Sequence, residues 1–234
     1  MNAAPRAVFF DVDFTLIYPG PRFQGEGYRQ FGAKYGVIMD PARFGAAVLS
    51  ASHILDSAQD SVYDDQIFID YTAHIIQQMG GCGPAVMACA AEIYQEWAAC
   101  RHFRLYDDVP AGLAALAERN VRIGLISNSH RCLESFQSHF ELEGLIDVAI
   151  SSSQHGYMKP HASIFEAALK LADVEAAESV MVGDSVSQDI VGAHRVGMRA
   201  VLVRRSEIVD PADQKVDEVP VSRTLLALPP LLYG

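Results

Sequence analysis

Short apolar runs that each end in polar residues constrain this fold more than any other feature of the sequence. Continuous apolar runs of this kind are typical of strands buried on both faces of a parallel sheet. We expect such strands at Ala7–Phe10, Val121–Ile126, Ile146–Ile150, Ser179–Val182 and Ala200–Val203. Helical patterns separate them at Pro110–Ala117, Ser163–Leu171 and Asp189–Val196. Strands that alternate with helices predict an α/β fold whose parallel sheet has right-handed crossovers.

The segment from about Pro19 to Arg104 has a different pattern, because it contains no strand-like run. Glycine and proline instead separate helical patterns at Gly25–Tyr35, Pro41–Gln59, Asp64–Met79 and Pro84–Cys100. We therefore predict an α-helical domain at residues 19–104, inserted into a core domain formed by residues 1–18 and 105–234. The tail after Arg205 is polar and then apolar at Leu225–Leu232, so we expect it to return to the core as a strand or a turn and helix.

Composition and charge exclude several classes of protein. Half of the residues are hydrophobic and 20% are charged, as in a globular protein. The formal net charge of −11 argues against nucleic acid and anionic membrane as partners, because both attract clustered lysine and arginine. The run Ala7–Phe10 is too short for a signal peptide or a membrane span. We therefore expect a soluble, cytoplasmic protein.

The four cysteines show no spacing that is typical of a zinc site. Free thiols in a reducing compartment are the simplest interpretation. Cys82, Cys89 and Cys100 lie in one segment, however, so the sequence leaves a disulfide among them open.

Two aspartates follow the first predicted strand, in Asp11-Val12-Asp13-Phe14-Thr15. Ligands of open parallel sheets bind beyond the carboxyl ends of the strands, so these carboxylates stand where chemistry is expected. Two neighbouring carboxylates repel each other unless a cation or a shared proton compensates. Mg²⁺ prefers oxygen ligands and would supply that charge. The alternative is a turn in which aspartate caps a following helix.

Polar residues also follow the other predicted strands. Ser127-Asn128-Ser129 offers a hydroxyl and backbone amides to a phosphate oxygen, or else caps the helix expected from Arg131. Lys159-Pro160 offers a positive charge, although a single lysine is more often a surface residue. Gly183-Asp184 is followed by Asp189 about one helical turn later, and helix capping by Ser185 or Ser187 is the alternative there.

In this order, the four motifs resemble those of the haloacid dehalogenase superfamily of phosphohydrolases. The resemblance covers residues 5–18 and 105–205 and implies a Rossmann-like core domain. The helical insert between the first and second motifs resembles the C1 type of cap domain. Only about 30 residues separate Asn128 from Lys159, which is too few for the other main cap type. Such a cap would close over the site, exclude water and select the substrate.

The resemblance also implies a role for each matching residue. Asp11 would be the nucleophile and a metal ligand, forming an aspartyl-phosphate. Asp13 would be the general acid and base, and its backbone carbonyl would bind the metal. Asp184 would be the second carboxylate ligand of Mg²⁺.

The remaining matches would act on charge and orientation. Ser127 and the amide of Asn128 would hold phosphoryl oxygens. Lys159 would bind the phosphate and offset negative charge. Thr15 would orient the nucleophile loop, and Asp189 would orient Lys159 or a metal-bound water. Phe14 stands where the family often has glycine, which affects specificity rather than catalysis.

The sequence therefore predicts a Mg²⁺-dependent phosphatase that acts on a small phosphorylated metabolite. A phosphosugar mutase would keep all four motifs and stays open. A dehalogenase would use an aspartyl nucleophile without Mg²⁺, but the family's dehalogenases lack the acid at Asp13. A non-catalytic binding protein on this fold would usually have lost the nucleophile or a metal ligand. Neither the substrate, nor the cap residues that would select it, nor the oligomeric state can be assigned from the sequence.

Overall fold

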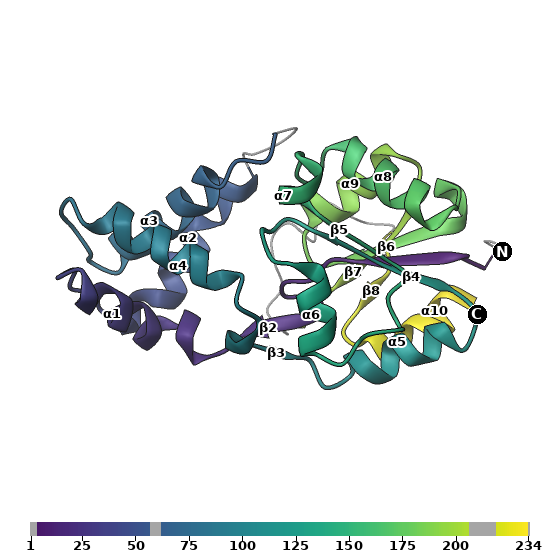
Figure 1. The fold of residues 1–234 in the computed structure, drawn as a ribbon, viewed down its shortest axis with the longest axis horizontal. Helices are drawn as coiled ribbons and strands as arrows, with labels where there is room; N and C mark the ends of the chain where they lie inside the picture. Colours follow the sequence, from purple (N-terminus) through teal and green to yellow (C-terminus); the bar gives the residue numbers. More distant parts are fainter. Residues whose placement is uncertain (1–3, 57–61, 206–218, 234) are drawn as a thin grey trace. The chain divides into compact units, whose positions relative to one another are not determined.

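A computed structural model describes residues 4–56, 62–205 and 219–233. Its main feature is a six-stranded sheet with the order β5-β4-β1-β6-β7-β8, in which every neighbouring pair is parallel (Figure 1). The strands are β1 (Ala7–Phe10), β4 (Arg122–Ser127), β5 (Val148–Ser151), β6 (Ser179–Gly183), β7 (Arg199–Val203) and β8 (Val221–Ser222). The predicted α/β fold class is therefore confirmed, and all five predicted strands are present.

The central strands form because their side chains are apolar on both faces. All four residues of β1 are fully buried, and β6 is buried along its whole length. Phe9 of β1 lies opposite Gly124 of β4 and Met181 of β6. A Cβ on Gly124 would lie 2.4 Å from the Phe9 ring, so glycine is required for these two strands to pair around that ring.

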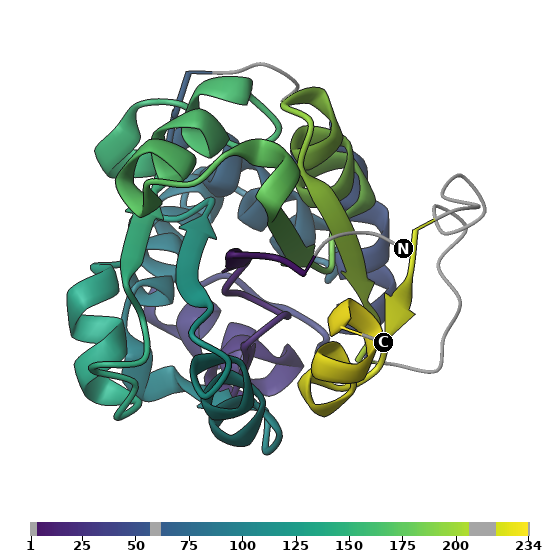
Figure 2. The same cartoon turned by 90° about the vertical axis from the view of Figure 1, so that its right-hand side faces the viewer.

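Helices cover both faces of the sheet (Figures 1 and 2). The helix α8 (Ala162–Ala172) and the helix α9 (Val191–Arg195) lie on one face, where Ile164 and Phe165 pack into the same apolar cluster as Phe9. The helices α5 (Val109–Ala117) and α10 (Leu228–Tyr233) lie on the other face. The core unit also contains α6 (Leu133–His139), α7 (Ser152–His155) and the 3-10 turn η4 (Ala176–Glu178).

One helix differs from the predicted pattern, and the C-terminal tail agrees with it. The helix expected from Asp189 begins earlier, as the π-helical turn η5 (Val186–Ile190), and continues as α9. The tail returns to the core through β8, the 3-10 turn η7 (Leu225–Ala227) and α10, as expected for a strand followed by a turn and helix. The polar part of that tail, residues 206–218, lies outside the described residues.

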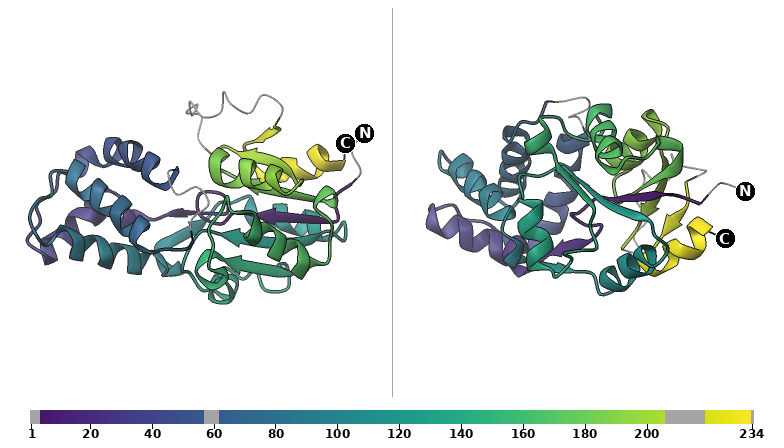
Figure 3. Two further views of the ribbon diagram at one scale, coloured as in Figure 1. Left: turned by 90° about the horizontal axis from the view of Figure 1, so that it is seen from above. Right: turned by 45° about the vertical axis from the view of Figure 1, so that its right-hand side comes forward.

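The chain divides into two compact units, Met1–Tyr18 with Leu105–Gly234, and Pro19–Arg104. The second unit is helical, and Figure 3 shows it in two further views. Its elements are η1 (Pro21–Phe23), α1 (Gly25–Lys34), η2 (Pro41–Arg43), α2 (Phe44–Asp56), α3 (Gln66–Gln78), α4 (Val86–Trp97) and η3 (Cys100–His102). The end of the predicted helix Pro41–Gln59 lies outside the described residues. Phe23 packs against Trp97 and Phe31, with ring centroids 4.7 and 6.4 Å away, so the unit has an apolar core of its own.

Two short strands at the ends of this helical segment were not predicted. β2 (Ile17–Pro19) and β3 (Phe103–Leu105) form a two-stranded sheet, and the N–H of Gly20 donates to the His102 carbonyl at 2.7 Å. Three residues are too few to show the alternation by which a strand is recognised in a sequence. The expectation that residues 19–104 contain no strand was therefore wrong at both ends.

Two further expectations concern cysteines and membranes. All four cysteines are free, with Cys89 and Cys100 buried and Cys82 and Cys132 exposed, so no disulfide forms among them. Among the described residues, no helix combines the length and the apolar character needed to cross a bilayer.

Candidate active site

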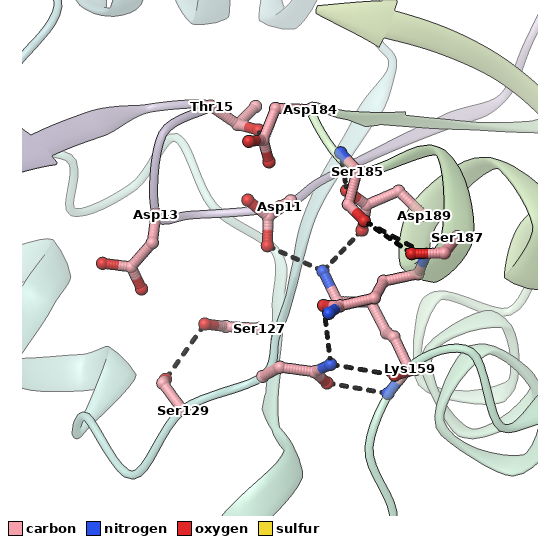
Figure 4. A network of polar contacts seen from close by, with 12 residues as sticks. Asp11, Asp13, Thr15, Ser127, Ser129, Lys159, Asp184, Ser185, Ser187 and Asp189 are labelled. Carbon is pink, nitrogen blue, oxygen red and sulfur yellow. Dashed lines mark hydrogen bonds and ion pairs between the residues drawn. The ribbon is translucent and has the colours of Figure 1, made fainter. Parts of the chain in front are cut away.

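The site is built where three neighbouring strands end. β1 lies between β4 and β6, so the loops that follow these strands leave the sheet at one edge. Asp11 directly follows β1, and its N–H donates to the Val182 carbonyl of β6 at 2.9 Å. Figure 4 shows the side chains of Asp11, Lys159, Asp184 and Asp189 directed toward one another. No helix follows Asp11 and Asp13, so the alternative that they cap a helix is wrong.

Lys159 is the central cation of this cluster. Its Nζ donates to Asp11 Oδ1 and to Asp189 Oδ1, both at 2.7 Å. Only 1% of the lysine side chain is exposed, so the alternative that it is a surface lysine is wrong. Burial alone would lower the pKa of Lys159, but the charges of Asp11 and Asp189 outweigh burial and raise that pKa above its ordinary value.

Three carboxylates crowd the space beside Lys159. Asp11, Asp184 and Asp189 each offer an oxygen, and these oxygens lie within 4.8 Å of one another. Burial, together with the charges of Asp189 and Asp13, raises the pKa of Asp11 to about 7 against the opposing effect of Lys159. Burial and the charges of Asp11 and Asp189 raise the pKa of Asp184 well above its ordinary value. The cluster therefore carries more negative charge than Lys159 compensates.

The donor set fits an oxygen-loving divalent cation such as Mg²⁺. Asp189 is the least suited of the three carboxylates, because Oδ1 accepts from Lys159 and Oδ2 accepts from the Ser185 N–H at 3.0 Å. The Asp184 carboxylate is held more weakly, because the Thr15 hydroxyl donates to its Oδ1 at 3.5 Å. Asp11 and Asp184 are thus the carboxylates best placed to bind the cation, and Asp189 holds Lys159.

Glycine permits this arrangement at the end of β6. A Cβ on Gly183 would lie 2.2 Å from Asp189 Oδ2, so any side chain there would displace the carboxylate. Ser185, in the alternative role considered for it, does cap the following turn by accepting from the Gln188 N–H at 3.2 Å. The loop after β6 therefore both caps the following turn, through Ser185, and contributes Asp184 and Asp189 to the carboxylate cluster.

Asn128 links the loop after β4 to the Lys159 loop. Its Oδ1 accepts from the Lys159 N–H at 2.7 Å, and its Nδ2 donates to the Lys159 carbonyl at 2.9 Å. Ser127 is buried, and its hydroxyl lies 3.0 Å from that of Ser129 (Figure 4). The following helix begins at Leu133 and is capped by Cys132, so the alternative that Ser127–Ser129 cap it is wrong.

A family model of haloacid dehalogenase-like hydrolases matches residues 5–197 of this chain. The chain belongs to that family. Human N-acylneuraminate-9-phosphatase is 31% identical to this hydrolase over 98% of the chain and 94% of the relative. Bovine haloacid dehalogenase-like hydrolase domain-containing protein 3 is 33% identical over 63% of this chain, and the match spans 58% of that relative's length. The structure of a HAD phosphatase from Thermococcus onnurineus matches with a TM-score of 0.65 and 24% identity, covering 98% of each chain.

Arg131 is a charged residue of the site of this hydrolase that was not predicted from the sequence. Arg131 is buried, and its Nη1 and Nη2 donate to the two carboxylate oxygens of Asp13 at 2.9 and 3.1 Å. Its position three residues after Asn128 was the only available signal, and arginine is ordinarily exposed.

The loop after Asp13 is also held by Arg205, which was not predicted as a site residue. Arg205 donates to the Thr15 carbonyl, from Nε at 3.2 Å and from Nη2 at 2.7 Å. The same guanidinium binds both carboxylate oxygens of Asp108 at 2.8 and 2.7 Å. Phe14, between the two held residues, has a φ of +64° and a side chain that is 44% exposed.

Proposed function

We propose that this hydrolase is a Mg²⁺-dependent phosphatase that cleaves a small phosphate monoester through an aspartyl-phosphate on Asp11. The observation that carries the proposal is the buried contact of Asp11 with Lys159 beside the carboxylate of Asp184. A nucleophile that must approach a phosphate dianion needs neighbouring positive charge, because charges interact strongly in a buried site. Lys159 supplies one such charge, and the donor set of Asp11 and Asp184 fits a divalent cation.

The first chemical step breaks the ester bond. An oxygen of Asp11 attacks phosphorus, and the bond from phosphorus to the leaving oxygen breaks with its electron pair going to that oxygen. Asp13 gives the leaving oxygen a proton, so an alcohol departs. Bound Mg²⁺ would lower the charge repulsion between Asp11 and the phosphate.

The second step frees the enzyme. Asp13, now ionised, takes a proton from a water molecule that attacks phosphorus, and the bond from phosphorus to Asp11 breaks. Inorganic phosphate leaves, and Asp11 returns to its carboxylate form. Ser127 and the backbone N–H of Asn128 hold phosphoryl oxygens in both steps, while Asp189 keeps Lys159 in place and Thr15 supports the loop.

The names of relatives support the class of substrate. N-acylneuraminate-9-phosphatase is named for the removal of phosphate from a sugar acid. By analogy, we propose that this chain acts on a phosphorylated metabolite, and that its helical unit, residues 19–104, is a C1-type cap that selects it. Free cysteines at Cys82, Cys89, Cys100 and Cys132 suit the reducing cytoplasm, where we place the enzyme.

Hydrolysis of p-nitrophenyl phosphate and of a panel of phosphorylated metabolites tests the proposal. We expect turnover with Mg²⁺, none with EDTA, and a loss of at least about 10⁴-fold in Asp11→Asn because the nucleophile is removed. Net isomerisation of a sugar phosphate without phosphate release would favour a mutase instead. A folded, metal-loaded protein without turnover on the whole panel would overturn the proposal.

A further inference from the structure

Arg131 makes a bidentate contact in the site that the proposed phosphatase mechanism does not use. Its side chain is 1% exposed, and its two terminal nitrogens bind the two oxygens of one carboxylate, that of Asp13. The Asp13 side chain is 18% exposed, so the pair is shielded from water mainly on the arginine side. Burying a guanidinium is costly, and the paired carboxylate offsets that cost.

The contact between Arg131 and Asp13 joins two loops of the site. Arg131 lies in the loop after β4, the loop that carries Ser127 and Asn128, while Asp13 lies in the loop after β1. β1 and β4 are hydrogen-bonded neighbours, so the ion pair ties two adjacent strand ends together. The loop after β4 therefore carries Ser127 and Asn128, which we expect to hold the phosphoryl group. Through Arg131, the same loop also fixes Asp13, which we expect to move the proton.

The contact is bidentate, because each terminal nitrogen of Arg131 donates to a different oxygen of Asp13. Two parallel N–H···O bonds fix the plane of a carboxylate as well as its position, which a single lysine ammonium does not do. A group that transfers a proton must be held close to a productive direction, because small displacements are costly in rate. We propose that Arg131 is a positioning residue that aims the Asp13 carboxylate at the leaving oxygen, a role that rests on the proposed phosphatase function.

This role makes a prediction about leaving groups. Phenyl phosphate and p-nitrophenyl phosphate have nearly the same shape, but the nitro group makes p-nitrophenolate the better leaving group. Expulsion of p-nitrophenolate needs little help from an acid, whereas expulsion of phenolate needs more. Misplacing Asp13 should therefore slow the transfer step for phenyl phosphate and leave that for p-nitrophenyl phosphate nearly unchanged.

The test compares kcat/KM of wild type and Arg131→Lys on the two aryl phosphates, because kcat/KM reports steps up to the first irreversible one. Arg131→Lys keeps the charge and loses the bidentate contact. We expect kcat/KM to fall by on the order of 10²-fold on phenyl phosphate and by less than about threefold on p-nitrophenyl phosphate. Arg6→Lys is the control, because Arg6 forms an exposed ion pair with Glu178 before β1; both substrates should be unaffected.

A double-mutant cycle guards against a general structural effect. In an Asp13→Ala background, Arg131→Lys should cause no further loss on phenyl phosphate, since the group it positions is absent. Equal losses on the two substrates, no loss on either, or additive losses in the cycle would each overturn the positioning role. A wild-type enzyme that hydrolyses neither ester with Mg²⁺ would instead overturn the phosphatase function, and with it this role. Circular dichroism spectra verify that each variant is folded.

Discussion

Asn128 binds the main chain of Lys159 on both sides, accepting from its N–H at 2.7 Å and donating to its carbonyl at 2.9 Å. This pair of hydrogen bonds joins the loop after β4 to the loop that carries the central cation. The side-chain amide of Asn128 thus fixes the position of the Lys159 backbone, from which the side chain extends to Asp11. Asn128, whose backbone amide we expect to hold a phosphoryl oxygen, therefore also has a structural role through its side chain.

Replacing Asn128 with alanine should reduce activity through Lys159. Both hydrogen bonds disappear, so the Lys159 loop loses its fixed position, and we expect kcat/KM on p-nitrophenyl phosphate to fall about 10²-fold. The matched control is Gln188→Ala, which removes only the contact from Asn128 Nδ2 to Gln188 Oε1 at 3.1 Å. That control should cost less than about threefold, because both bonds to Lys159 remain. Similar losses in the two variants would contradict the account.

Removing one carboxylate should stabilise the metal-free protein. Burial and the charges of Asp11 and Asp189 raise the pKa of Asp184, so its ionised form is unfavourable in the folded state. In EDTA at pH 8, Asp184→Asn should gain about 1 kcal/mol in the free energy of unfolding while losing Mg²⁺ binding. Asp107→Asn, an exposed aspartate in the same unit, is the control and should stay within about 0.5 kcal/mol of wild type. Chemical denaturation measures the free energy of unfolding of both variants. An Asp184→Asn variant that is less stable than wild type would contradict the repulsion among these carboxylates.

The metal-free enzyme should become less stable as the pH rises. The pKa of Asp11 is about 7 in the folded protein against an ordinary value of 3.8, so the folded state binds more protons than the unfolded state between these values. The free energy of unfolding therefore falls as pH rises toward 7 in EDTA. Asp11→Asn should flatten this dependence, and thermal unfolding across the range measures it. An unchanged slope in the variant would show that other groups dominate.

Magnesium binding should weaken in acid for the same reason. The cation must displace the proton that Asp11 holds below pH about 7, so the Kd for Mg²⁺ should rise by up to about tenfold for each pH unit below that value. Isothermal titration calorimetry at several pH values measures the Kd, and buffers of different ionisation enthalpy report the protons released. A Kd that does not change between pH 7 and pH 5 would exclude Asp11 as a ligand with this pKa.

Phe14 has a strained backbone conformation in the loop after β1. Its φ of +64° is in the left-handed region, which costs a non-glycine residue about 1 kcal/mol or more. Phe14→Gly should therefore be more stable than Phe14→Ala by about 1 kcal/mol, because only glycine adopts this φ without a Cβ penalty. Both variants should keep kcat/KM within about tenfold of wild type, since the ring donates no catalytic group. Equal unfolding free energies in the two variants would show that the turn is not strained.

The core strands could be predicted from the sequence because a strand that is buried on both faces is a continuous apolar run. Ala7–Phe10 and Ser179–Val182 are apolar throughout, and each ends where the chain turns polar. The alternation of strands and helices predicted a parallel sheet but not its strand order, since no local pattern shows that β1 lies between β4 and β6. The short strands β2 and β3 were missed because three residues carry no period.

The site was predictable to the extent that its members follow strands. Asp11 and Asp184 follow β1 and β6, and the structure brings their oxygens close together. Arg131 was missed because its burial depends on pairing with Asp13, 118 positions away in sequence, which no short-range pattern reveals. Lys159 was ambiguous for the same reason, and its contacts with Asp11 and Asp189 resolve it.

Trapping the covalent intermediate tests the central claim most directly. The enzyme is mixed with Mg²⁺ and excess p-nitrophenyl phosphate, quenched during turnover, treated with borohydride and digested for mass spectrometry. Borohydride reduces an acyl phosphate to an alcohol, so an aspartyl-phosphate at Asp11 becomes homoserine at that position. The account predicts homoserine at position 11 and at no other aspartate, and none when EDTA replaces Mg²⁺. Turnover that leaves Asp11 unmodified, or that labels Asp13 or Asp184 instead, would contradict it.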